Sequence, residues 1–263
     1  MKPLNVHAVG CVLPGLDGWA QARPVLAGQA PYVAAEVGAG ASELLPPNER
    51  RRATASVRLA FRAAEDAVKS AALKPADWAT VFASSDADTA IINRIVTALA
   101  EPARGVSPTD FHNCVHNAAA GYWSIGVGCR LPSTTLSAWD QSFAAGLLEA
   151  ATLVHADALP VLLVVYDIVP PEPLLSARPI TRPGAVALAL SDGSLTAPVL
   201  ARIELTAGAQ GDETPCADPA LDALRRTNPA ARALPLLTLL ASDIEGMVRL
   251  PAIDGLLEVR RCA

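Results

Sequence analysis

Hydrophobic residues along this chain form two kinds of pattern, short dense runs and longer stretches with helical spacing. The dense runs are rich in Val, Leu and Thr and end near Gly, Pro or Asp, as strands do. They predict strands at 5–13, 78–84, 133–138, 159–166, 184–190, 199–206 and near 256–260. We expect Asp192-Gly193 to form the turn that joins the fifth and sixth of these strands. The run LPVLLVVY at 159–166 has the apolar character of a central strand covered on both faces.

Helical spacing, with apolar residues three or four positions apart, fills most of the intervals between the strands. It predicts helices over about 48–71, 89–100, 113–128 and 143–154, and one or two more after residue 221. The first of them follows Pro46-Pro47, and Asn48 is expected to cap its N-terminus. Residues 207–220 have the composition of a linker. Strands that alternate with helices predict an α/β fold, a mixed sheet covered by helices on both faces.

The sharpest local feature is a strand, a polar corner and an apolar helix in direct succession at 133–154. The corner offers Asp140, Gln141 and Ser142 beside the N-terminus of the predicted helix. In α/β enzymes such a corner often exposes a nucleophile beside free backbone N–H groups. Capping of the helix would equally explain Asp140 or Ser142. Both interpretations stay open at this point, and the corner holds no cysteine.

Two histidines, His112 and His116, lie four residues apart in the stretch SPTDFHNCVHNAAAGYWSIGVG, with Cys114 between them. On one helix face such a pair could bind a metal ion, but no third ligand follows at suitable spacing. We therefore expect capping or hydrogen-bonded core histidines, with no metal site and no cofactor. Either histidine could instead pair with Ser142 in a hydrolase or acyltransferase, if the fold brings them together. Three glycines of this stretch suit close packing against a neighbouring element: Gly121, Gly126 and Gly128.

Composition and charge limit the classes of partner. Hydrophobic residues make up 51% of the 263 residues and charged residues only 18%, and a large subunit interface would cover the excess apolar surface. A net charge of −5, with no basic cluster larger than Arg50–Arg52, argues against nucleic acid. No apolar run reaches the roughly 20 residues of a membrane span. Five scattered cysteines, no CxxC pair and no signal-peptide core at the N-terminus predict a cytoplasmic protein.

The segment TTLSAWDQSFAAGLLEAATLV resembles the strand–turn–helix that carries the nucleophile in the thiolase-fold β-ketoacyl synthases. It is most similar to the short β-ketoacyl synthase-like N-terminal proteins, chain-length-factor-type subunits of aryl polyene and xanthomonadin-like pigment clusters. The stretches LPPNERRRA and SPTDFHNCVHNAAAGYWSIGVG resemble the same family. Aligning Glu149-Ala150-Ala151 with the end of the family motif places Asp140 where the acylated cysteine would sit.

The resemblance implies a thiolase-like half-fold. Residues 1–206 would form the ketoacyl synthase-like half, and residues 207–263 an extension packed on the same domain. It also implies that this chain alone condenses no substrate, because the elbow lacks the cysteine and the sequence contains no H-G-T-G, the context of a second-half histidine in full-length synthases. A carboxylate such as that of Asp140 is a weak acyl acceptor.

By the same resemblance, the chain is a noncatalytic partner of a full-length ketoacyl synthase in pigment or fatty-acid-like synthesis, in a heterodimer that could also meet acyl carrier protein. The interface strand would consist of Thr134, Thr135, Leu136, Ser137 and Ala138. Two alternatives remain. The chain could be a stand-alone acyltransferase or thioester hydrolase that uses Ser142 or Asp140, or a homodimeric module that binds acyl chains or acyl carrier protein.

Overall fold

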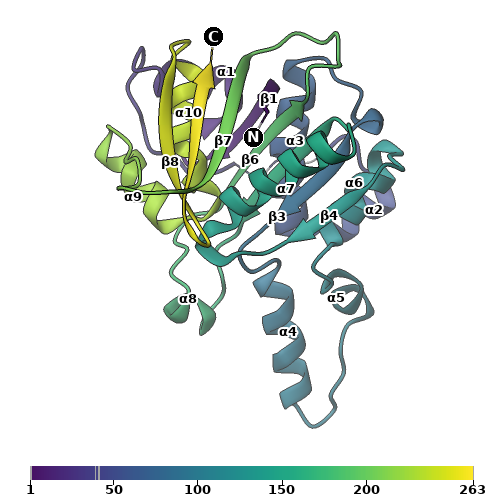
Figure 1. The fold of residues 1–263 in the computed structure, drawn as a ribbon. Helices are drawn as coiled ribbons and strands as arrows, with labels where there is room; N and C mark the ends of the chain where they lie inside the picture. Colours follow the sequence, from purple (N-terminus) through teal and green to yellow (C-terminus); the bar gives the residue numbers. More distant parts are fainter. Residues whose placement is uncertain (1, 39, 41, 263) are drawn as a thin grey trace.

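The computed structural model, which describes residues 2–38, 40 and 42–262, places nine strands in one mixed sheet between two layers of helices (Figure 1). The strands run in the order β4-β3-β5-β6-β1-β7-β9-β8, with β2 paired to β1. Their bounds are β1 Leu4–Leu13, β2 Leu16–Asp17, β3 Ala79–Ala83, β4 Ser133–Leu136, β5 Val161–Asp167, β6 Gly184–Ser191, β7 Ala201–Ala209, β8 Gly246–Ala252 and β9 Gly255–Cys262. Among the described strands, parallel pairing is confined to β3, which has β4 and β5 on its two sides. The predicted α/β class is confirmed.

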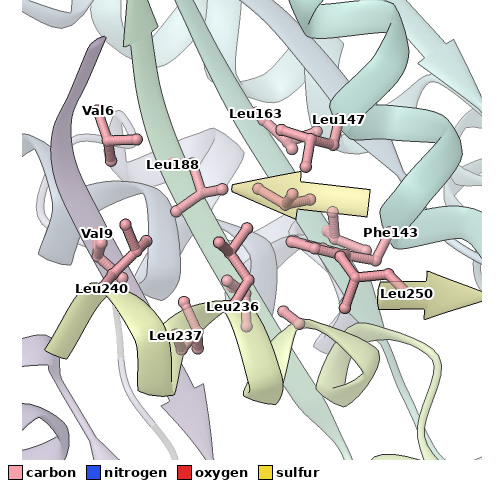
Figure 2. Close-up of a cluster of buried hydrophobic side chains, with 14 of the residues drawn as sticks. Val6, Val9, Phe143, Leu147, Leu163, Leu188, Leu236, Leu237, Leu240 and Leu250 are labelled. Atoms are coloured by element: carbon pink, nitrogen blue, oxygen red, sulfur yellow. The ribbon is translucent and has the colours of Figure 1, made fainter. Parts of the chain in front are cut away.

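Four helices pack on the two faces of this sheet. On one face α3 (Ala55–Ser70) and α6 (Ala118–Val127) meet through the aromatic rings of Phe61 and Trp123, whose centroids lie 5.1 Å apart. On the other face α7 (Ser142–Ala156) and α10 (Leu234–Ala241) pack on the sheet (Figure 2). Figure 2 shows leucines of α10 meeting Val9 of β1 and Leu188 of β6. Both faces of the central strands are therefore covered, which explains their continuous apolar runs.

The other described helices lie mainly at the edges of the sheet. They are α1 Trp19–Leu26, α2 Pro47–Arg52, α4 Thr89–Ala100, α5 Pro108–Asn113, α8 Leu174–Ala177 and α9 Pro219–Thr227, with 3₁₀ turns η1 Pro75–Asp77, η2 Trp139–Gln141 and η3 Ala230–Ala233. Helices α4 and α5 form an arm that projects beyond the sheet (Figure 1). No helix in the described ranges is long and apolar enough to cross a membrane.

The helix predicted over 48–71 is interrupted, and that prediction was wrong. The chain forms α2, leaves helical geometry at Ala53 and Thr54, and restarts as α3. The hydroxyl of Thr54 accepts a hydrogen bond from the backbone N–H of Val57 and so caps the new helix. Asn48 is not an N-cap. It lies inside α2, where its side chain accepts a hydrogen bond from Arg51.

The helix predicted over 113–128 was also wrong in its first turn. Asn113 ends α5, and α6 begins only at Ala118. His112 and His116 therefore do not share a helix face. Gly128 ends α6 with a left-handed backbone, φ 69°, as the C-terminal glycine of a helix commonly does.

The strands predicted at 184–190 and 199–206 do not form a hairpin. They become β6 and β7, and β1 lies between them, paired antiparallel with both. Residues 207–220 are not a linker, because β7 continues to Ala209 and the N–H of Thr214 donates to the carbonyl of Arg249. The tail adds a hairpin, β8 and β9, where one terminal strand was expected. Since β9 pairs with β7, the extension continues the sheet of the first half.

Candidate functional site

The predicted strand–corner–helix element is present, and it lies at the carboxyl ends of three adjacent strands. Strand β4 ends at Leu136, the corner follows as η2, and α7 starts at Ser142. Strand β4 is two residues shorter than the predicted strand, since Ser137 and Ala138 lie outside it. Trp139, the first residue of η2, has a left-handed backbone with φ 52°. The carboxyl ends of parallel strands are where α/β folds most often place ligands, so this corner is the natural candidate site.

Asp140 is held as a counter-ion at this corner. Its Oδ1 accepts a hydrogen bond from Nη1 of Arg178 at 2.6 Å. Nε of the same guanidinium donates to Oδ2 of Asp86 at 2.9 Å. The guanidinium carbon also lies 4.0 Å from the centroid of the Trp139 ring, a cation–π contact. Asp140 is thus occupied by a half-buried arginine whose side chain is 12% exposed.

The charges around Asp140 continue into the C-terminal extension. A guanidinium nitrogen of Arg232 lies 4.0 Å from Oδ2 of Asp140 and another 3.4 Å from Glu213. Glu213 also pairs with Arg225, at 2.9 Å, and Arg225 with Asp222, at 2.7 Å. Alternating charges therefore run from the loop after β3 through the elbow to α9. The extension supplies the second arginine at the elbow.

Ser142 is buried and its hydroxyl is fully used. The hydroxyl donates to the carbonyl of Trp139 at 2.7 Å and accepts from the N–H of Ala138 at 3.0 Å. Its relative exposure is 0%. A serine nucleophile needs a base and an approach for the substrate. Within the described residues no hydrogen bond joins Ser142 to His112 or His116, so the geometry favours a role in closing the turn.

A second carboxyl lies beneath the elbow at the end of β5. Oδ1 of Asp167 accepts hydrogen bonds from the N–H and hydroxyl of Ser85, at 2.8 and 2.6 Å. The same hydroxyl lies 2.8 Å from Oδ2 of Asp86, so one proton is shared between two carboxyl groups. Burial, opposed by the Ser85 hydrogen bonds, raises the pKa of Asp167 from 3.8 to about 7. Asp167 is therefore largely a neutral acid below neutral pH.

The rings of His112 and His116 have different contacts. Nε2 of His116 lies 2.6 Å from the hydroxyl of Ser137, which donates its proton to the carbonyl of Ser84 at 2.6 Å. The hydroxyl must therefore accept from His116, whose proton is on Nε2. His112 is exposed and its ring meets Tyr122 edge to face. Among the described residues no three His, Cys, Asp or Glu side chains gather in a group that could hold a metal ion.

We predict that His116 is structural. His116→Ala removes the donor to Ser137, so the free energy of unfolding should fall by about 1–2 kcal/mol in a urea titration. Burial lowers the pKa of His116, so its neutral form is the one that the fold favours. His112→Ala, at an exposed ring, is the matched control and should change stability less. Stoichiometric zinc that survives dialysis and is lost in His116→Ala would contradict this assignment.

The outer edge of β4 carries unpaired backbone groups. Carbonyls of Pro132 and Leu136 accept hydrogen bonds from the N–H groups of Thr80 and Ser84. Backbone groups alternate along a paired strand, so those of Thr134 also face β3 and those of Thr135 face outward. The predicted interface strand is thus the edge of the sheet, with Thr135 presenting its N–H and C=O to a further strand.

The sequence predicts the elbow but not the charged residues around it, which are Arg178, Asp86 and Asp167. Asp86 nevertheless follows one predicted strand, and Asp167 ends another. Polar residues at strand ends were the available signal. A cleft of about 470 Å³, lined by Tyr32, Arg182 and Leu224 among others, includes no residue of the elbow.

Comparison with known proteins bears on this geometry. The family described as β-ketoacyl synthase, N-terminal domain, matches residues 19–234. No curated protein sequence matches significantly. Among solved structures, the chain is similar to one in the ketosynthase ApeO in complex with its chain length factor ApeC from Xenorhabdus doucetiae. The TM-score is 0.75 and the identity 22%, with 99% of this chain and 100% of that chain covered.

Two further solved structures share the fold. The ishigamide ketosynthase/chain length factor matches with a TM-score of 0.75 and 15% identity over 99% of each chain. A type II polyketide synthase acyl-carrier protein in complex with its ketosynthase, AntDE:AntF, matches with a TM-score of 0.76 and 12% identity over the full length of both chains. At these identities the likeness establishes the fold, and the chain spans the whole length of all three matched chains.

Proposed function

The chain belongs to the family of β-ketoacyl synthase N-terminal domains, and on this basis we propose that it is a noncatalytic, chain-length-factor-type subunit that pairs with a full-length ketosynthase. Residues 1–206 form the thiolase-like half in this proposal, and residues 207–263 an extension packed on it. The setting would be the cytoplasm, and the product a polyene or fatty-acid-like chain such as an aryl polyene pigment. An acyl carrier protein would visit the assembled heterodimer. The role needs no cofactor.

The observation that carries the proposal is the state of the elbow. A ketosynthase needs a thiolate at this position, activated by the helix N-terminus. Here the aligned residue is Asp140, and its carboxylate is bound by Arg178. Ser142, the other oxygen nucleophile at the corner, is buried with its hydroxyl engaged. The corner is a strand, a turn and a helix without a free group that could accept an acyl chain.

Uncovered apolar surface supports a partner. The arm helix α4, described over its whole length, buries Ile91 alone. Ile92, Val96 and Leu99, which share one helix face, are 42%, 60% and 51% exposed. A 12-residue helix with so little packing is marginal in water by itself. A second subunit that covers the arm would stabilise it.

The solved structures with this fold point to the kind of partner. Two of them are described as ketosynthases with chain length factors, and a third as an acyl-carrier protein with its ketosynthase. Each matched chain is covered over nearly its whole length, so this half-fold is also the size of a separate subunit in those assemblies. The open β4 edge and the two residues that follow it are the surface that we propose for the heterodimer, through Thr134, Thr135, Leu136, Ser137 and Ala138.

We predict that the purified chain condenses no malonyl-thioester with an acyl primer, and that Asp140→Cys does not restore condensation. The substitution leaves Arg178 with Asp86 as its remaining partner, and it supplies no second-half histidines. Product formation is measured by mass spectrometry with the chain alone and with a full-length ketosynthase from the same genome. Turnover by the chain alone, abolished in Asp140→Ala, would reverse the proposal.

The two alternatives give different outcomes in the same experiment. A stand-alone hydrolase would release thiol from an acyl-thioester without a partner, and Ser142→Ala would abolish the release. A homodimeric binding module would sediment as a dimer and ignore the added ketosynthase. The proposed subunit instead forms a stable heterodimer and has no activity by itself.

A further inference from the structure

Trp139 is unlike the other tryptophans of this chain. Its relative exposure is 55%, whereas Trp19, Trp78 and Trp123 are exposed by 7%, 4% and 0%. These are all four tryptophans of the sequence, and all lie in the described ranges. A lone exposed apolar residue needs no explanation by itself. A half-exposed tryptophan at the end of an open sheet edge, however, is the type of residue that forms hot spots of protein interfaces.

The ring is held in its outward position from three directions. The backbone of Trp139 has φ 52°, a left-handed angle that a residue other than glycine adopts only when the surrounding structure imposes it. On one side, the N–H of Ala138 and the carbonyl of Trp139 are both bound by the hydroxyl of Ser142. On the other, Asp140 is bound by Arg178. The guanidinium of Arg178 lies against the ring, so the indole has little freedom to fold away.

The charges beside the ring are already paired within this chain, and this decides the chemistry of the partner surface. Arg178 pairs with Asp86 and Asp140, and Arg232 with Asp140 and Glu213. A partner that covers the ring therefore needs no opposite charge of its own. A buried ion pair is costly when one member is left unpaired, which is not the case here. Cation–π attraction between Arg178 and Trp139 also grows when water is excluded. An apolar pocket fits this surface better than a charged one.

A further exposed apolar residue lies near the same end of β4. His116 bonds to Ser137, two residues before Trp139, and its neighbour Val115 is 50% exposed. The backbone groups of Thr135, four residues before Trp139, face outward. Strand pairing and an aromatic anchor would thus be adjacent.

From these observations we infer that Trp139 is the anchor by which this chain inserts into an apolar pocket of its ketosynthase partner, and that Arg178 is the residue that positions it. The inference rests on the proposed function and adds a specific residue pair to it. In this view Asp140 and Asp86 orient the Arg178 guanidinium beneath the indole.

The test uses the full chain labelled with 5-fluorotryptophan and an unlabelled full-length ketosynthase from the same genome. The ¹⁹F line of Trp139 is assigned with Trp139→Phe. On complex formation this line should shift and lose its response to a water-soluble paramagnetic quencher, while the three lines of the buried tryptophans change little. Trp139→Ala should weaken binding at least about tenfold, measured by sedimentation or calorimetry, and Trp139→Phe less. Ile253→Ala, at a residue 71% exposed in the turn of the opposite edge hairpin, is the matched control and should bind as the wild type does.

Arg178 has its own readout. Arg178→Met should move the Trp139 line in the free chain, before any partner is added, and should weaken binding, with Arg178→Lys intermediate. If a tight complex forms but Trp139 stays open to the quencher and Trp139→Ala binds within twofold, the inference is wrong while the proposed function stands. If no ketosynthase binds, both fail. If Trp139 is shielded only when the chain self-associates, the molecule that covers it is a second copy of this chain. The inference of a ketosynthase partner at Trp139 would then be wrong.

Discussion

The free energy of unfolding of the wild-type chain is expected to fall by about 3 kcal/mol between pH 5 and pH 8, and Asp167→Asn should abolish this fall. The side chain of Asp167 is 2% exposed, its pKa is raised from 3.8 to about 7, and its Oδ2 has no partner among the described residues. Between those two pKa values the folded chain holds one proton more than the unfolded chain. The free energy of unfolding therefore falls as the pH rises through this interval, and the whole penalty is present above about pH 7.

Asparagine keeps the acceptor for Ser85 and cannot ionise, so the variant should show no such fall. Urea titrations of both proteins at pH 5, 6, 7 and 8 measure the difference. Ser85→Ala offers a second check, because it removes a hydrogen bond that lowers the pKa of Asp167. The fall should then extend to higher pH. Parallel stability curves for the wild type and Asp167→Asn would show that this carboxyl ionises in the folded chain as it does in the unfolded one.

Thr135→Pro is expected to dissociate the heterodimer and leave the subunit folded. Proline has no N–H, and the N–H of Thr135 faces the outer edge of β4, where no strand of this chain pairs in the described structure. Without this donor a carbonyl of the partner strand stays buried and unpaired, which costs about 1–3 kcal/mol. The dissociation constant should therefore rise by roughly 5- to 150-fold.

The neighbouring residue supplies the control. The backbone groups of Thr134 face β3, so Thr134→Pro should instead lower the stability of the isolated subunit in a urea titration. Size-exclusion chromatography of each variant with the ketosynthase separates the two effects. A Thr135→Pro chain that still forms the complex at wild-type affinity would show that the partner does not pair with β4.

Strand positions were predictable because burial on both faces demands dense apolar runs. Val161–Asp167 and Gly184–Ser191 are buried along their whole length, and their sequences show it directly. The corner at 139–142 could be predicted as well, since a strand, a polar turn and an apolar helix follow one another without a gap. Both features depend on residues that are close in sequence.

Breaks within predicted helices were missed for a local reason that periodicity does not report. The apolar spacing continues through Ala53, yet Thr54 offers its hydroxyl to the following turn and a new helix starts there. Between Asn113 and Ala118 the apolar and small residues likewise keep a helical pattern, but the chain is not helical. A capping side chain competes with the helix, and hydrophobic spacing does not record the competition.

The amino-acid sequence by itself determined the α/β class, the position of the elbow, the absence of a thiolate there and the family to which the corner belongs. The class follows from the alternation of strands and helices along the chain, and the other three from residue types within one short segment. Only the tertiary structure decided what Asp140 does, because its partner Arg178 lies 38 residues later in the chain and the other partner of that arginine, Asp86, lies 92 residues before it. It likewise placed β1 between β6 and β7, and turned Thr135 toward an open edge. Ion pairs and strand order join residues that are distant in sequence, and many pairings of the same charges and strands satisfy the local patterns equally well.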